Sequence, residues 1–285
     1  MFKIFSNEIS INTFPDGTPH ISLDLKPILN LITANKCNQI ELSWFFEGSD
    51  NPLDLAFIVS HLRAQSELVN TPLILNLPYV PNARMDRVHD KTSEVFTLKY
   101  FANFINSLNF TRVNVLDPHS DVSMALINHA YNDQDLLIKW YKYIDHQLRL
   151  DNAQPEVIVF PDAGSVKRYS PLTNEAFPNL PITYADKERD WNEGVIKGLH
   201  LNNPELVKDK HILIVDDICS RGGTFTYTAK ALLEAGAATI NLAVTHTEPT
   251  IFFGTILTDN QIQKVFTTNS LFKSDHPNID VYALD

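Results

Sequence analysis

The stretch from His211 to Thr228 limits the possible folds of this chain more than any other. The four residues after His211 are apolar and have the composition of a strand buried on both faces, and Asp216 and Asp217 follow them directly. A glycine pair and a Thr-rich segment come next, with the character of a helix start. The order of strand, acids, glycine loop and helix predicts a parallel α/β sheet.

The same stretch has the residue types of a ligand site. The glycines let the backbone turn tightly and present its N–H groups, and the positive end of the following helix attracts an anion such as phosphate. Asp216 and Asp217 are acceptors suited to sugar hydroxyls or to a divalent cation. The alternative is an ordinary strand-to-helix turn with two solvated acids and an N-cap. Together, the features favour a site for a sugar phosphate.

Length and composition suit a globular protein with two domains. The chain has 285 residues, of which 44% are hydrophobic, and a formal net charge of −11. Such a length can bury two separate cores, and we expect domains at residues 1–142 and 143–285. The acidic balance argues against a nucleic-acid partner, because phosphate backbones are bound through an excess of Lys and Arg.

The two cysteines and the N-terminus bear on the compartment. Cys37 and Cys219 fit neither a zinc motif nor a disulfide framework, which favours reduced thiols and the cytoplasm. Residues 1–8 do not resemble a signal peptide, and we expect neither a membrane span nor a membrane partner.

The first half holds three further segments of interest. Phe14-Pro15-Asp16-Gly17 predicts a turn between short strands. A predicted buried strand at residues 73–80 leads to Arg84-Met85-Asp86-Arg87, where two guanidinium groups could clamp a polyphosphate or form a surface ion-pair cluster. His119 ends the next predicted strand, at residues 113–116, where an imidazole can bind a metal or a phosphate, although most lone histidines have a structural role.

The second half repeats the same rhythm. A predicted strand at residues 157–160 leads to Asp162 and Gly164, and a charged run at residues 186–190 has the composition of a solvated loop. Residues 128–155, which are polar and aromatic, are expected to connect the domains. Alternating strands and helices in both halves predict an α/β protein with two doubly wound domains and parallel sheets.

The motifs resemble those of one enzyme family. The stretch 211–228 is similar to the phosphoribosyl-diphosphate loop of type I phosphoribosyltransferases and of ribose-phosphate diphosphokinases. Five further segments resemble segments of the diphosphokinases in the same order: the turn at Phe14, the Arg84–Arg87 segment, the segment ending at His119, the turn at Asp162 and the run around Lys187. Phosphoribosyltransferases lack the first three of these segments. The resemblance therefore implies a diphosphokinase with two phosphoribosyltransferase-like domains.

The resemblance also implies an activity and a role for each motif. The enzyme would transfer the β,γ-diphosphate of ATP to the C1 hydroxyl of ribose 5-phosphate, releasing AMP, with Mg²⁺ held in part through His119 and Asp162. Homo-oligomers, either dimers or rings of dimers, are implied as well. The implied catalytic residues are Lys187, Arg189 and His119; those for ATP are Phe14, Asp16, Arg84, Met85, Asp86, Arg87 and His119; those for the ribose phosphate are Asp216, Asp217, Ser220, Arg221, Gly222, Gly223 and Thr224.

Some residues depart from the family's pattern. Ser220 and Arg221 stand where an Asp and a Thr are usual, which makes the loop more cationic and suggests an acceptor with a larger 5′ group, such as ADP-ribose in NAD salvage. Met85 replaces an amide, Thr18 replaces a Glu, and Glu188 interrupts the basic run. A phosphoribosyltransferase and a non-catalytic regulatory homologue remain as alternatives.

Overall fold

The chain folds into two compact units, residues 1–133 and 134–284. The structure, a computed structural model, describes residues 1–34, 36–48, 50–88, 93–189 and 196–284, and it gives the backbone alone for residues 187–189 and 196–198. The expected domain boundary at residues 142 and 143 falls inside helix α5 (Gln134–Leu150), which belongs as a whole to the second unit.

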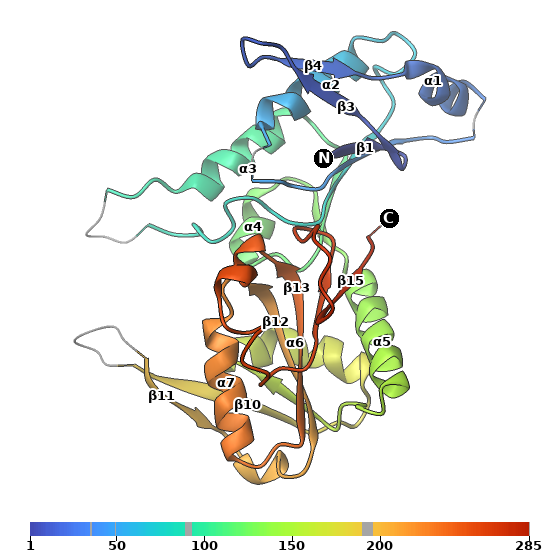
Figure 1. The fold of residues 1–285 in the computed structure, drawn as a ribbon. Helices are drawn as coiled ribbons and strands as arrows, with labels where there is room; N and C mark the ends of the chain where they lie inside the picture. The colour runs from blue at the N-terminus through green and yellow to red at the C-terminus, as the bar shows by residue number, and fades with distance from the viewer. Residues whose placement is uncertain (35, 49, 89–92, 190–195, 285) are drawn as a thin grey trace. The chain divides into compact units, whose positions relative to one another are not determined.

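The first unit is built on a mixed sheet with the strand order β2-β1-β5-β6-β7-β8 (Figure 1). Strands β5 to β8 pair in parallel, whereas β1 is antiparallel to both β2 and β5. A separate hairpin joins β3 and β4. The elements are β1 (Phe2–Ile4), β2 (Asn7–Glu8), β3 (Ser10–Thr13), β4 (Pro19–Ser22), α1 (Leu25–Thr33), β5 (Ile40–Trp44), α2 (Pro52–Arg63), β6 (Leu73–Leu77), α3 (Thr97–Ser107), β7 (Arg112–Val115), α4 (Asp121–Leu126) and β8 (Ala130–Asn132).

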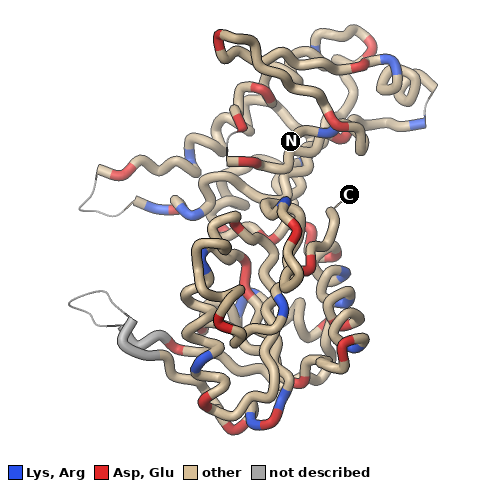
Figure 2. The backbone as a smooth tube through the Cα atoms, in the orientation of Figure 1, with Lys and Arg blue, Asp and Glu red and all other residues tan. Residues whose placement is uncertain are grey.

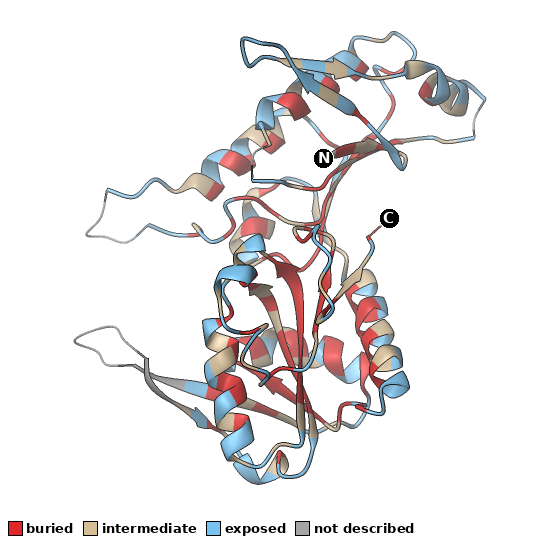
Figure 3. Ribbon diagram, in the orientation of Figure 1, coloured by how far each residue is buried: buried red, intermediate tan, exposed pale blue. Residues whose placement is uncertain are grey.

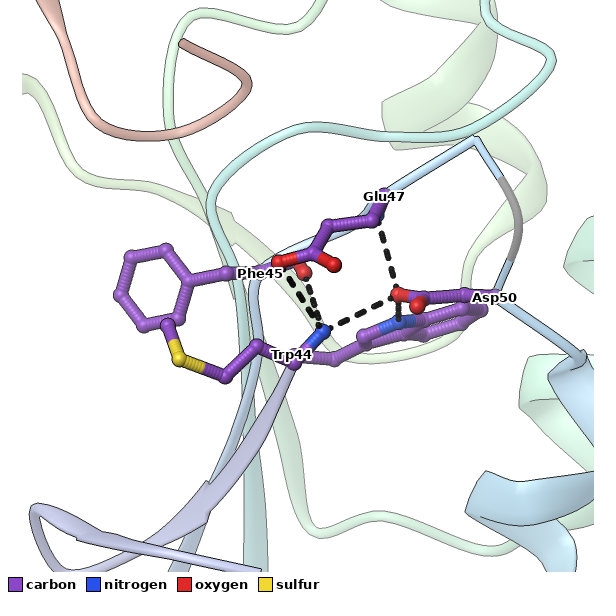
Figure 4. A network of polar contacts seen from close by, with 5 residues as sticks. Trp44, Phe45, Glu47 and Asp50 are labelled. Atoms are coloured by element: carbon purple, nitrogen blue, oxygen red, sulfur yellow. Dashed lines mark hydrogen bonds and ion pairs between the residues drawn. The ribbon is translucent and has the colours of Figure 1, made fainter. Parts of the chain in front are cut away.

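A polar network fixes the loop between β5 and α2 (Figure 4). The Asp50 carboxylate accepts hydrogen bonds from the indole N–H of Trp44 at 2.7 Å and from the backbone N–H of Glu47 at 2.9 Å. The amino group of Met1 donates to the same carboxylate at 3.2 Å and to the Phe45 carbonyl at 2.9 Å. Trp44 is fully buried, so its N–H needs a partner, and Asp50 provides one.

The second unit is built on a longer sheet with the strand order β11-β10-β9-β12-β13-β14-β15. All neighbouring strands pair in parallel except β10 and β11. Its elements after α5 are β9 (Val157–Phe160), α6 (Ala163–Ala176), β10 (Ile182–Arg189), β11 (Ile196–Leu201), η1 (Pro204–Leu206), β12 (His211–Cys219), α7 (Gly223–Glu234), β13 (Thr239–Thr247), η2 (Pro249–Phe253), β14 (Val265–Thr268) and β15 (Ile279–Tyr282).

The central strands of this sheet are covered on both faces. Every residue of β9 is buried, as are Ile212–Val215 of β12 and Ile240–Thr247 of β13 (Figure 3). Such continuous apolar runs are typical of parallel strands between layers of helices. Helix α5 carries both buried and exposed residues along its ribbon (Figure 3), and its buried residues include Trp140 and Tyr141.

The expected fold class, α/β with parallel sheets, is confirmed, and several boundaries move. Strand β12 continues through both acids to Cys219, four residues beyond the predicted end at Val215. Residues 134–150, expected to be part of a connection, form α5, the longest helix described. Acidic and basic residues are interspersed along the backbone of both units (Figure 2). Within the described residues, no helix is long and apolar enough to cross a membrane.

Candidate active site

The sheet of the second unit has a reversal point between β9 and β12. Strand β9 leads through α6 to β10 on one side, and β12 leads through α7 to β13 on the other side. In open α/β sheets, ligands bind outside the carboxyl ends of the strands at such a reversal. Asp162 lies two residues beyond the end of β9 and Asp216 lies near the end of β12, so both acids stand at this place.

Side chains from α6 connect the acids of the two strands. Asp162 caps α6 by accepting the N–H of Ser165 at 3.0 Å. The Ser165 hydroxyl lies 3.3 Å from Asp162 Oδ1 and 3.2 Å from Asp216 Oδ1, so it bridges the two carboxylates. Arg168 forms an ion pair with Asp217, with 3.8 Å between Nη1 and Oδ2. Ser165 and Arg168 were not among the predicted site residues, because helical spacing alone does not show which side chains reach a neighbouring strand.

The neighbouring acids of this cluster disfavour the ionisation of Asp216. Burial away from water, and then the charge of Asp217, raise the pKa of Asp216 to about 8. The charge of Asp162 acts in the same direction, against the hydrogen bond from Ser165. A group of carboxylates in this state favours a ligand that brings hydrogen-bond donors or positive charge.

The loop after β12, residues 220–224, is named here the phosphate loop. Gly222 has φ +79°, a left-handed conformation that favours glycine, and a Cβ there would lie 2.9 Å from the Ile256 side chain. The loop leads into α7, whose N-terminus has no side-chain cap. The first N–H groups of this 12-residue helix are therefore open to an anion, and the residues Arg221 and Gly223 at this end are exposed.

The segment after β13 packs against the backbone of the phosphate loop. A Cβ at Gly254 would lie 2.8 Å from the carbonyl carbon of Arg221 and closer still to its oxygen. Glycine at position 254 is therefore required for the backbones of two segments to approach this closely. The hydroxyl of Ser220 lies 2.9 Å from that of Thr250 in η2, so the predicted phosphate ligand Ser220 already has a partner within the protein.

In the first unit, the predicted adenine-binding turn joins β3 and β4. The backbone N–H of Gly17 donates to the Phe14 carbonyl at 2.9 Å, and Gly17 has φ +85°. Asp16 accepts hydrogen bonds from the N–H of Thr18 at 3.0 Å and from its hydroxyl at 2.7 Å. These bonds from Thr18 lower the pKa of Asp16. The Phe14 ring is 50% exposed, so the turn presents an aromatic surface to solvent.

The predicted arginine segment follows β6, next to the carboxyl end of β7. The Asp86 carboxylate is buried and accepts two hydrogen bonds from the guanidinium of Arg87, at 2.8 and 3.2 Å. The bond from Arg87 lowers the pKa of Asp86 against burial, and the charge of nearby His119 adds to this effect. The structure therefore brings this segment together with His119. Arg84 is exposed, Met85 is half-buried, and the exposed side of Arg87 remains available to an anion.

The predicted catalytic basic residues lie on the outer part of the sheet. Lys187 and Arg189 belong to β10, where Lys187 pairs with Leu199 of β11 and Arg189 pairs with Ile196. The ladder is irregular between Glu188 and Arg189. The expected loop at residues 186–189 is therefore strand in this structure. The side chains of Lys187 and Arg189 lie outside the described residues.

A metal ion would need ligands from its substrate. Within the described residues, no group of three or more His, Cys, Asp or Glu side chains is placed to hold a metal ion. Mg²⁺ is usually held by one or two carboxylates together with substrate phosphates and water. The Asp162 carboxylate, which the N–H and the hydroxyl of Ser165 hold in place, fits such partial coordination.

Comparison with known proteins identifies the family. A model of the phosphoribosyl transferase domain matches residues 130–264. The chain is 30% identical over 230 residues to a ribose-phosphate pyrophosphokinase of Chlorobaculum tepidum, a match that covers 80% of this chain and 67% of that protein. The chain belongs to the ribose-phosphate pyrophosphokinase family. This family is the one named above as the diphosphokinases, and its members are enzymes.

Other members of the ribose-phosphate pyrophosphokinase family give the same picture. A ribose-phosphate pyrophosphokinase 2 of Enterococcus faecalis is 29% identical over 235 residues, which cover 80% of this chain and 67% of that protein. The fold matches that of the phosphoribosylpyrophosphate synthetase of Mycobacterium smegmatis with a TM-score of 0.68, at 20% identity, over 97% of this chain and 86% of the other.

Proposed function

We propose that this pyrophosphokinase transfers the β,γ-diphosphate of ATP to the C1 hydroxyl of a ribose 5-phosphate unit. The observation that carries the proposal is the site at the reversal of the second sheet, where acids rich in acceptors adjoin an uncapped helix N-terminus. Acceptors suit sugar hydroxyls and the helix end suits a phosphate, so the two halves of the site match the two halves of one ligand.

In the proposed reaction, the C1 oxygen attacks the β-phosphorus of ATP in line. A bond from this oxygen to the β-phosphorus forms, the bond from the β-phosphorus to the oxygen of the α-phosphate breaks, and AMP leaves. The hydroxyl proton is released to solvent, and no general base is assigned. Phosphoryl chemistry of this kind depends mainly on positioning and on neutralising charge.

The residues have distinct tasks in this proposal. Asp216 and Asp217 hold the ribose hydroxyls, and the loop of residues 220–224 holds the 5-phosphate through backbone N–H groups. Arg84 and Arg87 bind ATP, with Asp86 fixing the orientation of Arg87. Phe14 and Asp16 contact the adenine of ATP bound by a second copy of the chain, which makes the working enzyme a homo-oligomer. His119 and Asp162 would be protein ligands of Mg²⁺, which would supply positive charge to the ATP phosphates. Lys187 and Arg189 neutralise the transferring group.

The first acceptor candidate is ribose 5-phosphate itself. The second is ADP-ribose, which contains the same ribose 5-phosphate unit. The exposed Arg221 guanidinium favours ADP-ribose because it adds positive charge to the loop, which suits a diphosphate better than a terminal monophosphate.

The test supplies each acceptor with ATP and Mg²⁺ and identifies the products by mass spectrometry. The proposal expects AMP together with a product heavier than the acceptor by one diphosphate group. Lys187→Ala should abolish AMP formation, whereas Lys230→Ala on the exposed side of α7 should leave it unchanged. Arg221→Thr should shift preference towards ribose 5-phosphate if ADP-ribose is the natural acceptor. Release of diphosphate from a phosphoribosyl diphosphate and a base would point instead to a phosphoribosyltransferase, and no AMP with either sugar would point to a non-catalytic homologue.

A further inference from the structure

Residues 248–250 hold the first residue of the phosphate loop by a chain of hydrogen bonds. The N–H of Glu248 donates to the Cys219 carbonyl at 2.8 Å, which anchors the two segments side by side. The hydroxyls of Ser220 and Thr250 lie 2.9 Å apart. The Thr250 hydroxyl in turn donates to Oε2 of Glu248 at 3.2 Å.

The bond from Thr250 to Glu248 constrains the direction of the bond between the two hydroxyls. A hydroxyl has one proton to donate and two lone pairs to accept with. Thr250 gives its proton to the Glu248 carboxylate, which has none to give in return. The bond between the two hydroxyls must therefore use the proton of Ser220. The Ser220 oxygen then has lone pairs alone to offer to a ligand.

An oxygen in this state discriminates between ligand groups. A phosphate oxygen in a dianion carries no proton, so it would meet a lone pair of Ser220 and be repelled. A sugar hydroxyl can donate to the same lone pair. Ser220 is half-buried, so a ligand can reach it, and it follows the acceptors Asp216 and Asp217 on the same strand and loop.

We propose that Glu248, acting through Thr250, makes the Ser220 hydroxyl an obligate acceptor, so that Ser220 binds a hydroxyl of the sugar and not an oxygen of its phosphate. Glu248 and Thr250 are then positioning residues, and Ser220 belongs with the acids as a sugar-binding residue. The proposal rests on the proposed function, because it concerns how the same site divides its contacts between sugar and phosphate.

The test measures binding of two probes, ribose 5-phosphate and inorganic phosphate, by calorimetry. Ser220→Ala should weaken the binding of ribose 5-phosphate about three- to tenfold, which corresponds to the loss of one neutral hydrogen bond, and it should leave the binding of inorganic phosphate unchanged. Thr250→Val, which keeps the branched shape, releases the Ser220 proton and should strengthen inorganic phosphate at least about threefold. Thr250→Ser keeps the chain of bonds and should behave as the wild type.

The double variant Ser220→Ala/Thr250→Val should lose the gain of Thr250→Val, because the released proton belongs to Ser220. If Ser220 donated a hydrogen bond to the phosphate instead, Ser220→Ala would weaken the binding of inorganic phosphate by about tenfold or more, and that result would overturn the proposal. A gain that persists in the double variant would overturn it too, since it would come from a general change in the loop.

The proton can also be located without any ligand. A neutron structure of the wild-type protein should place deuterium on Ser220, directed at the Thr250 oxygen, and a second deuterium on Thr250, directed at Glu248. Deuterium on Thr250 that points to Ser220 contradicts the proposal even if the protein makes the expected product. Conversely, failure to form AMP with either acceptor rejects the proposed function, and the neutron structure still tests the position of the Ser220 proton.

Discussion

The close approach of Gly254 to the phosphate loop allows a sharp test of the active site. We expect Gly254→Ala to impair catalysis by displacing the loop. Gly254 has φ −102° and ψ −173°, an extended conformation that alanine adopts readily, so the added methyl group acts through space alone. A Cβ would lie 2.8 Å from the Arg221 carbonyl carbon and closer to its oxygen, and the clash is with backbone.

Relief of the clash requires the Arg221 peptide to move by on the order of 1 Å, because carbon and oxygen atoms attract only beyond about 3 Å. A misplacement of about 1 Å in a site that works by positioning can cost about 100-fold in rate, which corresponds to about 2.7 kcal/mol of transition-state stabilisation. We therefore expect kcat/KM for the sugar acceptor to fall by about two orders of magnitude, with a smaller effect on KM for ATP.

The control is Gly48→Ala, at a glycine outside the proposed ligand site. A Cβ at Gly48 meets no atom within 4 Å, so this variant should keep near wild-type kinetics. Both variants are assayed by AMP formation well below their melting temperatures, since overpacking at Gly254 also costs about 1–3 kcal/mol of stability. Equal kcat/KM for the two variants would refute the view that the position of the Arg221 peptide matters for the reaction.

Two further predictions concern charge. Arg87→Ala removes the two hydrogen bonds that Arg87 donates to the buried Asp86 carboxylate and should lower the free energy of unfolding by about 1–3 kcal/mol. Arg84→Ala, at an exposed position of the same segment, should lower it far less. Equal urea midpoints for the two variants would contradict this prediction. The raised pKa of Asp216 means that the folded protein keeps a proton that the unfolded chain releases near pH 4, so stability from this group is present below about pH 4 and is lost as the pH rises towards about 8. In EDTA, the urea midpoint of the wild type should fall over this range more than that of Asp216→Asn, while Asp275→Asn, an exposed control, should follow the wild type; parallel curves for all three would count against the raised pKa.

The central part of the fold could be predicted from the sequence because its signals are local. A continuous apolar run, paired acids and paired glycines fix a strand, a loop and a helix within about 25 residues, and the structure has β12, the loop and α7 at these positions. The turn at Gly17 between β3 and β4 follows in the same way from turn residues between short alternating strands.

Other features depend on partners far away in the sequence. Strand β12 continues past Val215 because β13 pairs with it as far as Cys219 and Thr247, and nothing in the residues of β12 shows the length of its neighbour. The support of the phosphate loop by Thr250 and Gly254 likewise joins segments about 30 residues apart. A lone glycine and a lone threonine carry no local signal of such a contact.

Helix α5 could have been found from its sequence. Its buried residues Leu137, Tyr141, Ile144 and Leu148 recur every three or four positions, which is the spacing of an amphipathic helix. The charged residues between them make the stretch polar on average, so its overall composition does not indicate a helix.

Each unit contains a buried tryptophan whose intrinsic fluorescence can report on the folding of that unit. Trp44 is packed in the first core and hydrogen-bonded to Asp50, and Trp140 is packed in the second core on α5. Fluorescence of variants that retain a single indole would report separately on the loosening of each half. A ligand of the first unit and a ligand of the second could then be distinguished by which tryptophan emission they protect.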